Sequence, residues 1–303
     1  MSSFRGYLFI LGAALFWGGS AVIAKLLLNQ NIPPFVLVQM RVTFSFLLIA
    51  GFYLVFKRDL LRVRTRDLYR FALLGVIGVA GANFTYYFTI HLTNVSTAIL
   101  IQYTAPLLVV GYGALTREEH IGPVKVIAAA VSLAGCYFAL GGTQLSLPNI
   151  SVLGLVSGIG SAVCWAFTNV YLRHLLKDYK VWTVLTYSFL FATFFWFFFM
   201  TPWQFVQQDF SVSDWLMFVG FAAISVLIPH SLYFIGMQYI VPSRAIVTAT
   251  FEPVVVIVGS FLILGDSMTP VQIFGAVLVM TAIAILQMKR EEGNVISHPE
   301  QQS

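Results

Sequence analysis

Long apolar runs separated by short polar stretches are the feature of this sequence that most restricts its fold. The runs are about 20 residues long, the length at which an α-helix crosses the hydrocarbon core of a bilayer. Only 10% of the residues are charged, against about 25% in an average soluble protein, so a soluble globule would lack polar residues for its surface. A transmembrane β-barrel is disfavoured because its strands would alternate apolar and polar residues. We therefore predict an all-α integral membrane protein.

Ten membrane-spanning helices account for these runs. Short connections join them, and the polar residues 291–303 predict a disordered cytoplasmic tail. The predicted bounds of the spans are 6–28, 34–56, 69–90, 95–115, 123–141, 152–173, 181–201, 214–237, 244–264 and 270–288.

Lysine and arginine residues are confined almost entirely to alternate loops. This positive-inside distribution predicts that both termini are cytoplasmic, in a cell (inner) membrane. It explains the net charge of +5 without a nucleic-acid partner. Only Lys25 and Arg41, both within spans, depart from the pattern, whereas Lys125, Arg173 and Arg244 are interpreted as topology signals. The loops without Lys or Arg are 29–33, 91–95, 142–151, 202–213 and 265–269.

The second half of the chain repeats the first. Residues 98–123 align with residues 245–270 at an offset of 147, and Trp17 aligns with Trp165 at an offset of 148. Since each half holds an odd number of spans, five, the second half crosses the membrane in the opposite sense. Inverted-topology repeats can exchange conformations and open a central site to either side in turn. This pattern favours transport over a duplication that only packs.

Two five-helix repeats, over residues 1–147 and 148–290, are therefore predicted. The chain resembles the EamA family of the drug/metabolite transporter superfamily in its ten spans, its inverted repeat and its small-residue-rich first span. The resemblance covers residues 4–290 and includes a proline followed by an acidic residue in each half. It implies secondary transport without ATP, often export, through a cavity lined by spans 1–4 and 6–9. Members move amino acids, nucleotide-related metabolites, sugars or drugs, so the resemblance does not choose a substrate.

The repeated prolines are Pro106 and Pro253. Each removes the helical hydrogen bond to the carbonyl four residues earlier, at Gln102 or Ala249. A freed carbonyl in hydrocarbon needs a partner or a water-lined cavity. We interpret both prolines as gating kinks; kinks satisfied by neighbouring helices are the alternative.

Glu252 and Arg41 are charged residues within spans, where an unpaired charge is costly and usually functional. Glu252 could carry a coupled proton or contact a substrate amine. Its structural alternative is a bond to Lys25, Arg41 or a tyrosine hydroxyl. Arg41 could hold a carboxylate in bidentate fashion or form an interhelical salt bridge. Because Glu252 and Arg41 have opposite charges, the two residues together favour amino acids or related zwitterions as substrates.

Other polar and aromatic residues within spans are further candidates for the substrate path, with interhelical hydrogen bonds as the alternative. Glu119 and Asp266 instead resemble helix-start residues, since each precedes a helix that begins with proline. The further candidates are Trp17, Trp165, Tyr87, His91, Gln102, Asn169, His230 and Tyr233.

The predicted function is secondary active transport of small metabolites by alternating access. The sequence contains no zinc-protease, phosphate-loop or clustered Cys/His motif, so we expect no catalytic residue, no metal and no cofactor. The expected partners are the lipid bilayer, a small-molecule substrate and a coupled proton, with the chain a monomer or a homodimer. A uniporter or channel-like facilitator remains an alternative, followed by an intramembrane enzyme or a membrane scaffold.

Overall fold

The computed structural model describes residues 2–28, 34–142, 151–199, 201 and 210–288, and every regular element in this part is helical. The predicted tail at 291–303 lies outside the described residues. The first half holds α1 (Ser2–Leu28), α2 (Pro34–Phe56), the 3₁₀ turns η1 (Arg58–Leu61) and η2 (Thr65–Asp67), α3 (Leu68–Leu73), the π-helical η3 (Leu74–Gly81), α4 (Ala82–Leu92), α5 (Val95–Gln102), α6 (Ala105–Thr116) and α7 (Pro123–Ala139).

The second half has a similar series. It holds α8 (Val152–Asp178), α9 (Val181–Phe197), α11 (Val212–Ala222), the π-helical η6 (Ala223–Leu227), α12 (Ile228–Gly236), α13 (Pro242–Ala249), α14 (Glu252–Gly259), the π-helical η7 (Ser260–Leu264) and α15 (Pro270–Met288).

The ten predicted spans are confirmed. Eight helical segments of the described chain are long and apolar enough to cross a membrane, and α7 and α9 are shorter apolar helices of 17 residues each. The largest differences from the predicted boundaries are at three helices: α1 begins at Ser2 rather than at 6, α8 continues beyond 173 to Asp178, and α9 ends at Phe197 rather than at 201. The apolar runs therefore predicted where the helices lie more accurately than where they begin and end.

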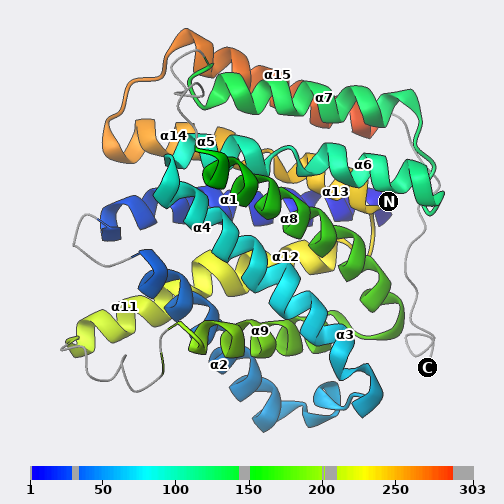
Figure 1. Cartoon of the computed structure of the whole chain (residues 1–303), viewed down its shortest axis with the longest axis vertical. Coiled ribbons are helices and arrows are strands. Elements are labelled where there is room, and N and C mark those ends of the chain that lie inside the picture. The colour runs from blue at the N-terminus through cyan, green and yellow to red at the C-terminus, as the bar shows by residue number, and fades with distance from the viewer. Residues whose placement is uncertain (1, 29–33, 143–150, 200, 202–209, 289–303) are drawn as a thin grey trace.

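Helices α7 and α15 lie side by side at one edge of the molecule (Figure 1). Glycines make this pairing close: a Cβ added at Gly275 would lie 2.1 Å from the backbone nitrogen of Ala139. The pair corresponds to predicted spans 5 and 10. Its edge position agrees with the peripheral place that the family resemblance implies for them.

Helix α1 packs against α12, α13 and α14, and α4 packs against α8. Small residues allow α1 to approach its neighbours: a Cβ at Gly18 would lie 2.6 Å from Val255 of α14. A core cluster that includes Phe71, Phe189, Trp196 and Tyr233 is buried beneath these helices. Helices of both halves thus share one interior.

Irregularities of the helices recur at the repeat offset. The π-helical η3 and η6 occupy corresponding parts of spans 3 and 8, and the breaks α5–α6 and α13–α14 fall in spans 4 and 9. Departures from α-helix at corresponding positions of the two halves support the repeat. Turns of π-helix are also frequent at functional sites.

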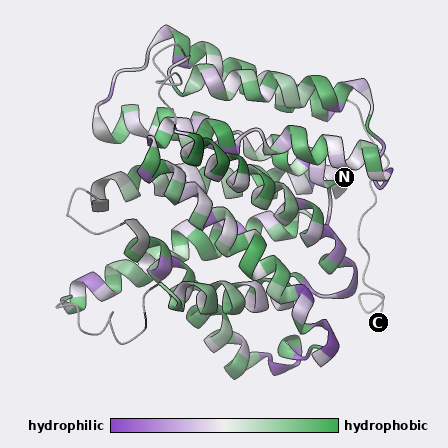
Figure 2. Cartoon of the chain, viewed as in Figure 1, coloured by the Kyte–Doolittle hydropathy of each residue, from purple (hydrophilic) through white to green (hydrophobic). Residues whose placement is uncertain are grey.

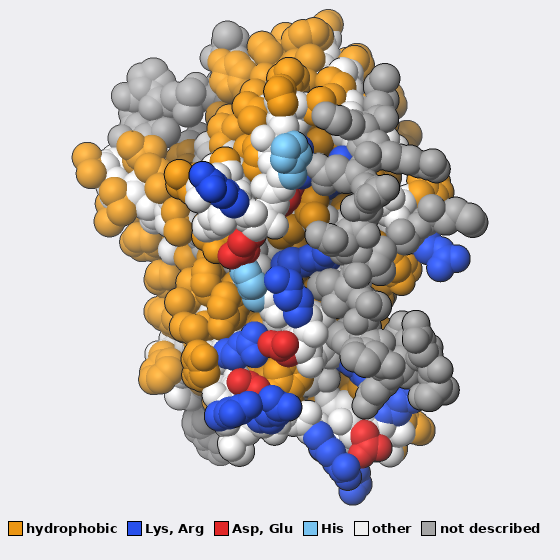
Figure 3. Space-filling view, turned by 90° about the vertical axis from the view of Figure 1, so that its right-hand side faces the viewer, with side chains coloured by type: hydrophobic (Ala, Val, Ile, Leu, Met, Phe, Trp, Pro, Cys, Tyr) orange, Lys and Arg blue, Asp and Glu red, His pale blue; other side chains and the backbone are white. Residues whose placement is uncertain are grey.

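Polar residues gather at one end of the molecule. Hydropathy is high along the helices and falls at the right-hand end of the view in Figure 2. Figure 3 looks onto that end and shows Lys, Arg, Asp, Glu and His side chains grouped there, with hydrophobic side chains around them. We call this end face the basic end; it carries the residues that the positive-inside pattern assigns to the cytoplasm.

Candidate functional site

The two proline helices are interrupted rather than bent. Helix α5 ends at Gln102 and α6 begins at Ala105; α13 ends at Ala249 and α14 begins at Glu252. The predicted kinks are therefore short turns followed by new helices. Each proline stands in the first turn of its second helix, where the missing N–H costs nothing.

The two breaks meet each other. The Tyr103 hydroxyl, in the turn of the first break, donates to Glu252 Oε2, at the start of the second, over 3.1 Å. Tyr103 is only 8% exposed and packs in an apolar cluster with Cys136 and Val254. Of the alternatives that the sequence left open for Glu252, the structure shows the tyrosine hydroxyl.

Arg41, on α2, is half-buried and has no ion pair among the described residues. Its Nε is buried without a hydrogen-bond partner there, and its guanidinium carbon lies 5.8 Å from the ring centroid of Phe221. The charge of Arg41 interacts electrostatically with Glu252, His230 and Tyr86. Arg41 and Glu252 thus lie within electrostatic range of each other, and no salt bridge joins them in the described part of the chain.

Four predicted aromatic residues form one cluster, with Trp17 of α1 at its centre, and a fifth predicted residue, Asn169, is hydrogen-bonded to it. The Trp17 ring lies 5.3 Å from both His230 and Tyr233 of α12 and 5.8 Å from Trp165 of α8. The Tyr233 hydroxyl donates to Asn169 Oδ1, and the Asn169 amide donates to the Trp165 carbonyl at 2.8 Å. Repeat partners Trp17 and Trp165 therefore touch. The buried Tyr233–Asn169 pair is also an interhelical hydrogen bond, which the sequence gave as the alternative.

Three predicted residues do not join this cluster. Among the described residues, Tyr87, His91 and Gln102 make neither a ring contact nor a hydrogen bond with it. Tyr87 is half-buried against Tyr86, His91 is exposed at the end of α4, and Gln102 ends α5. The side chain of Lys25, an alternative partner for Glu252, lies outside the described residues.

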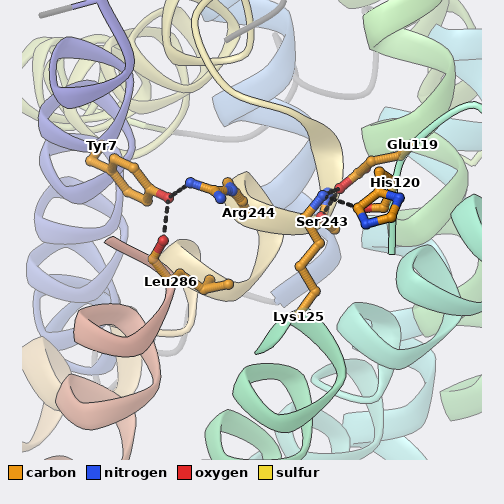
Figure 4. A network of polar contacts seen from close by, with 7 residues as sticks. All are labelled: Tyr7, Glu119, His120, Lys125, Ser243, Arg244 and Leu286. Carbon is orange, nitrogen blue, oxygen red and sulfur yellow. Dashed lines mark hydrogen bonds and ion pairs between the residues drawn. The ribbon is translucent and has the colours of Figure 1, made fainter. Parts of the chain in front are cut away.

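A second polar group, absent from the predicted site, lies at the basic end (Figure 4). The Glu119 carboxylate forms an ion pair with Lys125 Nζ at 2.8 Å and accepts hydrogen bonds from the hydroxyl and backbone N–H of Ser243. Lys125 also donates to the His120 carbonyl at 2.6 Å. The loop between α6 and α7 is thereby fixed to the first turn of α13, in the other half of the chain.

Arg244, next to Ser243, extends this connection. Its Nη1 donates to the Tyr7 hydroxyl at 3.0 Å, and Tyr7 donates to the Leu286 carbonyl at 3.5 Å (Figure 4). Arg173 of α8 donates to the Met237 carbonyl at the end of α12. We call the contacts of Glu119, Lys125, Ser243, Arg244 and Tyr7 the end network.

The end network extends one expectation and corrects another. Glu119 contacts the first turn of α7 through Lys125, in line with the helix-start interpretation, and it also contacts the start of α13 through Ser243, which the sequence did not predict. Lys125, Arg244 and Arg173 are not loop charges in water: they are 3%, 5% and 8% exposed. The sequence offered only one signal for the network, the recurrence of Glu119 as Asp266 in the second half, and Asp266 is exposed.

No group of three His, Cys, Asp or Glu residues within the described part of the chain is arranged to hold a metal ion.

Known proteins are similar to this chain in sequence. The EamA-like transporter family matches residues 4–141 and 152–288. "Uncharacterized inner membrane transporter YicL" of Salmonella typhimurium is 26% identical over 293 residues, covering 95% of this chain and 96% of that protein. "Threonine/homoserine exporter RhtA" of Escherichia coli (strain K12) is 23% identical over 221 residues, covering 71% and 70%.

A crystal structure with 20% sequence identity has a TM-score of 0.75 and covers 93% of this chain and 96% of its own, which shows the same fold. The family match extends over both halves of the chain, and the helices found there are the ten apolar spans. The protein is therefore a multi-pass membrane transporter, and it belongs to the EamA-like transporter family.

Proposed function

We propose that this transporter is a secondary active exporter of small zwitterionic metabolites, amino acids among them, working by alternating access. The observation that carries the proposal is the placement of Arg41 and Glu252. They have opposite charges and lie within electrostatic range of each other, yet no ion pair joins them among the described residues. A ligand with one negative and one positive charge would pair with both Arg41 and Glu252.

An amino acid supplies those charges. Its carboxylate would meet the guanidinium of Arg41, whose planar N–H groups suit bidentate binding. Its ammonium would meet the carboxylate of Glu252, which among the described residues has only the Tyr103 hydroxyl within hydrogen-bond distance. The cluster around Trp17 adds aromatic faces, which attract cations and cover apolar side chains. That a relative is named a threonine/homoserine exporter favours the same substrate class.

Alternating access would use the helix breaks and the end network. The network joins the α6–α7 loop of the first half to α13 of the second, so it holds the halves together at the basic end. Opening that end requires separation of Glu119 from Ser243. The turns before α6 and α14 are sites where half-helices can reorient. With both termini in the cytoplasm of the cell, as the positive-inside pattern predicts, the closed end is the cytoplasmic one.

A coupled proton would drive export, with Glu252 as its carrier. Glu252→Gln keeps the size of the side chain and its contact with Tyr103 but cannot exchange a proton. We expect this variant to fold and to lose flux driven by a pH gradient, measured in proteoliposomes. Unchanged proton-driven flux would rule Glu252 out as the carrier.

Counterflow tests the proposal as a whole. Proteoliposomes loaded with unlabelled threonine should accumulate labelled threonine transiently and saturably, because a carrier exchanges substrate at one site. Flux that does not saturate and shows no counterflow would indicate a channel-like facilitator. Chemical conversion of the substrate would indicate an enzyme. If a panel of amino acids gave neither flux nor conversion, a membrane scaffold would be the remaining alternative. The Arg41→Gln variant should lose counterflow, whereas the exposed Arg117→Gln should retain it.

A further inference from the structure

A polar pocket opens at the basic end, and it is separate from the end network. It has a volume of about 850 Å³ and lies where η1, η2 and the start of α3 approach the end of α8. Four arginines and two aspartates contribute charge to its wall, so the pocket is positive. These residues are Arg62, Arg64, Arg66, Arg70, Asp67 and Asp178.

The two carboxylates of the pocket are already engaged. Arg70 Nη1 lies 2.7 Å from Asp178 and 3.8 Å from Asp67. The Tyr179 hydroxyl donates to Asp67 at 2.5 Å. Burial, then the bond to Asp67, raises the pKa of Tyr179, so this hydroxyl remains protonated and keeps donating. The engaged carboxylates therefore leave the remaining arginines free to act on another anion.

Three arginines are available for that anion. Arg64 and Arg66 are exposed and have no ion pair among the described residues. Arg62 pairs only with Asp59, and both side chains are more than 80% exposed, at 84% and 83%. Exposed pairs of this kind contribute little and exchange readily. Arginine N–H groups match the oxygens of a phosphate in bidentate geometry.

We propose that this pocket binds the phosphate of an anionic phospholipid headgroup in the membrane leaflet at the basic end. The arginines follow directly on α2, whose last turn exposes Val55 and Phe56 at 70% and 69%. Tyr69, 63% exposed, lines the pocket itself. Apolar side chains beside the arginines suit acyl chains, which a free phosphate ion lacks. Anionic lipids are enriched in the cytoplasmic leaflet, and basic residues next to a span attract them.

The bound headgroup would stabilise a joint between the two halves. Arg70 and Asp67 belong to the first half, and Asp178 and Tyr179 to the second. A ligand that binds only the folded pocket raises the free energy of unfolding, by an amount that grows with the logarithm of ligand concentration once that concentration exceeds Kd. Lipid binding can therefore be measured on the purified chain without any transport assay.

The test is a titration of the full chain in neutral detergent with phosphatidylglycerol, with phosphatidylcholine and with inorganic phosphate, followed by native mass spectrometry and thermal unfolding. We expect phosphatidylglycerol to bind, and Arg64→Gln/Arg66→Gln to weaken it by about 10-fold or more, since each basic residue near an anionic headgroup contributes on the order of 1 kcal/mol. Arg5→Gln/Arg117→Gln removes the same charge from exposed positions outside the pocket and should change binding less than about 2-fold.

Several results would overturn the proposal. Equal loss in both double variants would indicate general electrostatic attraction. Equal binding of phosphatidylcholine would remove the role of the negative charge. Binding of inorganic phosphate as tight as that of phosphatidylglycerol would make the site a free-anion site. If the Arg64→Gln/Arg66→Gln chain does not fold, Arg66→Gln alone is titrated in the same way, and unchanged lipid affinity there contradicts the assignment.

Discussion

The end network and the middle of the spans arrange their charges in opposite ways. At the basic end, Glu119 and Lys125 are paired at 2.8 Å, with side chains only 8% and 4% exposed. In the middle, Arg41 and Glu252 interact electrostatically but form no ion pair among the described residues. Paired charges at the basic end stabilise one conformation, whereas charges without a partner in the middle of the spans can bind a ligand. We propose that this difference separates a gate from a binding site.

The two regions also respond differently to mutation. Breaking a buried ion pair leaves one charge without compensation and destabilises the state that contains it. Removing a charge that has no partner in the free protein hardly changes the stability of that protein. It weakens the binding of the ligand instead. Variants in the end network should therefore change stability and access, and variants around Arg41 should change affinity.

Lys125→Met should have the largest effect, because it leaves Glu119 buried without its cation. Loss of one partner of a buried pair costs about 3–5 kcal/mol. We expect a lower melting temperature and an end network that opens more often. Labelling of Ala245→Cys, a buried position beside Arg244, by an impermeant maleimide should become at least about 10-fold faster.

That experiment requires a chain in which Cys136 and Cys164 are replaced, so that Ala245→Cys is the only thiol. Arg117→Gln, an exposed charge change near the same loop, serves as the control. Labelling that is equally slow in Lys125→Met and in the control would show that the ion pair does not keep this end closed.

Arg41→Gln should have the next largest effect, which is a loss of substrate affinity. A hydrogen-bonded contact to a charged group contributes about 1.5–3 kcal/mol, so KM for threonine should rise by about 10- to 100-fold in proteoliposomes. Thermal unfolding of the free protein should hardly change, since Arg41 Nε has no partner to lose among the described residues. A fall in stability with an unchanged KM would place Arg41 with the end network instead.

The sequence predicted the helices more fully than the contacts between them. Apolar runs determine spans locally, and each proline marks a lost N–H bond, but whether the helix bends or restarts depends on its neighbours. Glu119 and Ser243 are 124 residues apart, and Tyr7 and Arg244 are 237 apart. Side chains at such separations meet only through tertiary packing. The repeat did point to Trp17 and Trp165, which the structure brings into contact.

Tyr103→Phe should have the smallest effect. It removes the Tyr103–Glu252 hydrogen bond between the two helix breaks while keeping the ring that fills the surrounding apolar cluster. A net hydrogen bond to a charged group is worth about 1.5 kcal/mol, so threonine affinity should change by no more than about 10-fold. Isothermal titration would measure it, with Tyr112→Phe, an exposed tyrosine bonded to Glu118, as the control. A loss of affinity as large as that of Arg41→Gln would mean that the tyrosine, not the charge pair, dominates recognition.

The central claim is that Arg41 meets the carboxylate of a zwitterionic substrate. The most direct measurement compares the binding of threonine and threonine methyl ester, which keeps the ammonium but lacks the carboxylate charge, to the wild-type chain and to Arg41→Gln. We predict that Arg41→Gln weakens threonine binding by about 10- to 100-fold and leaves binding of the ester nearly unchanged. Equal weakening of both ligands, or of neither, would contradict the claim.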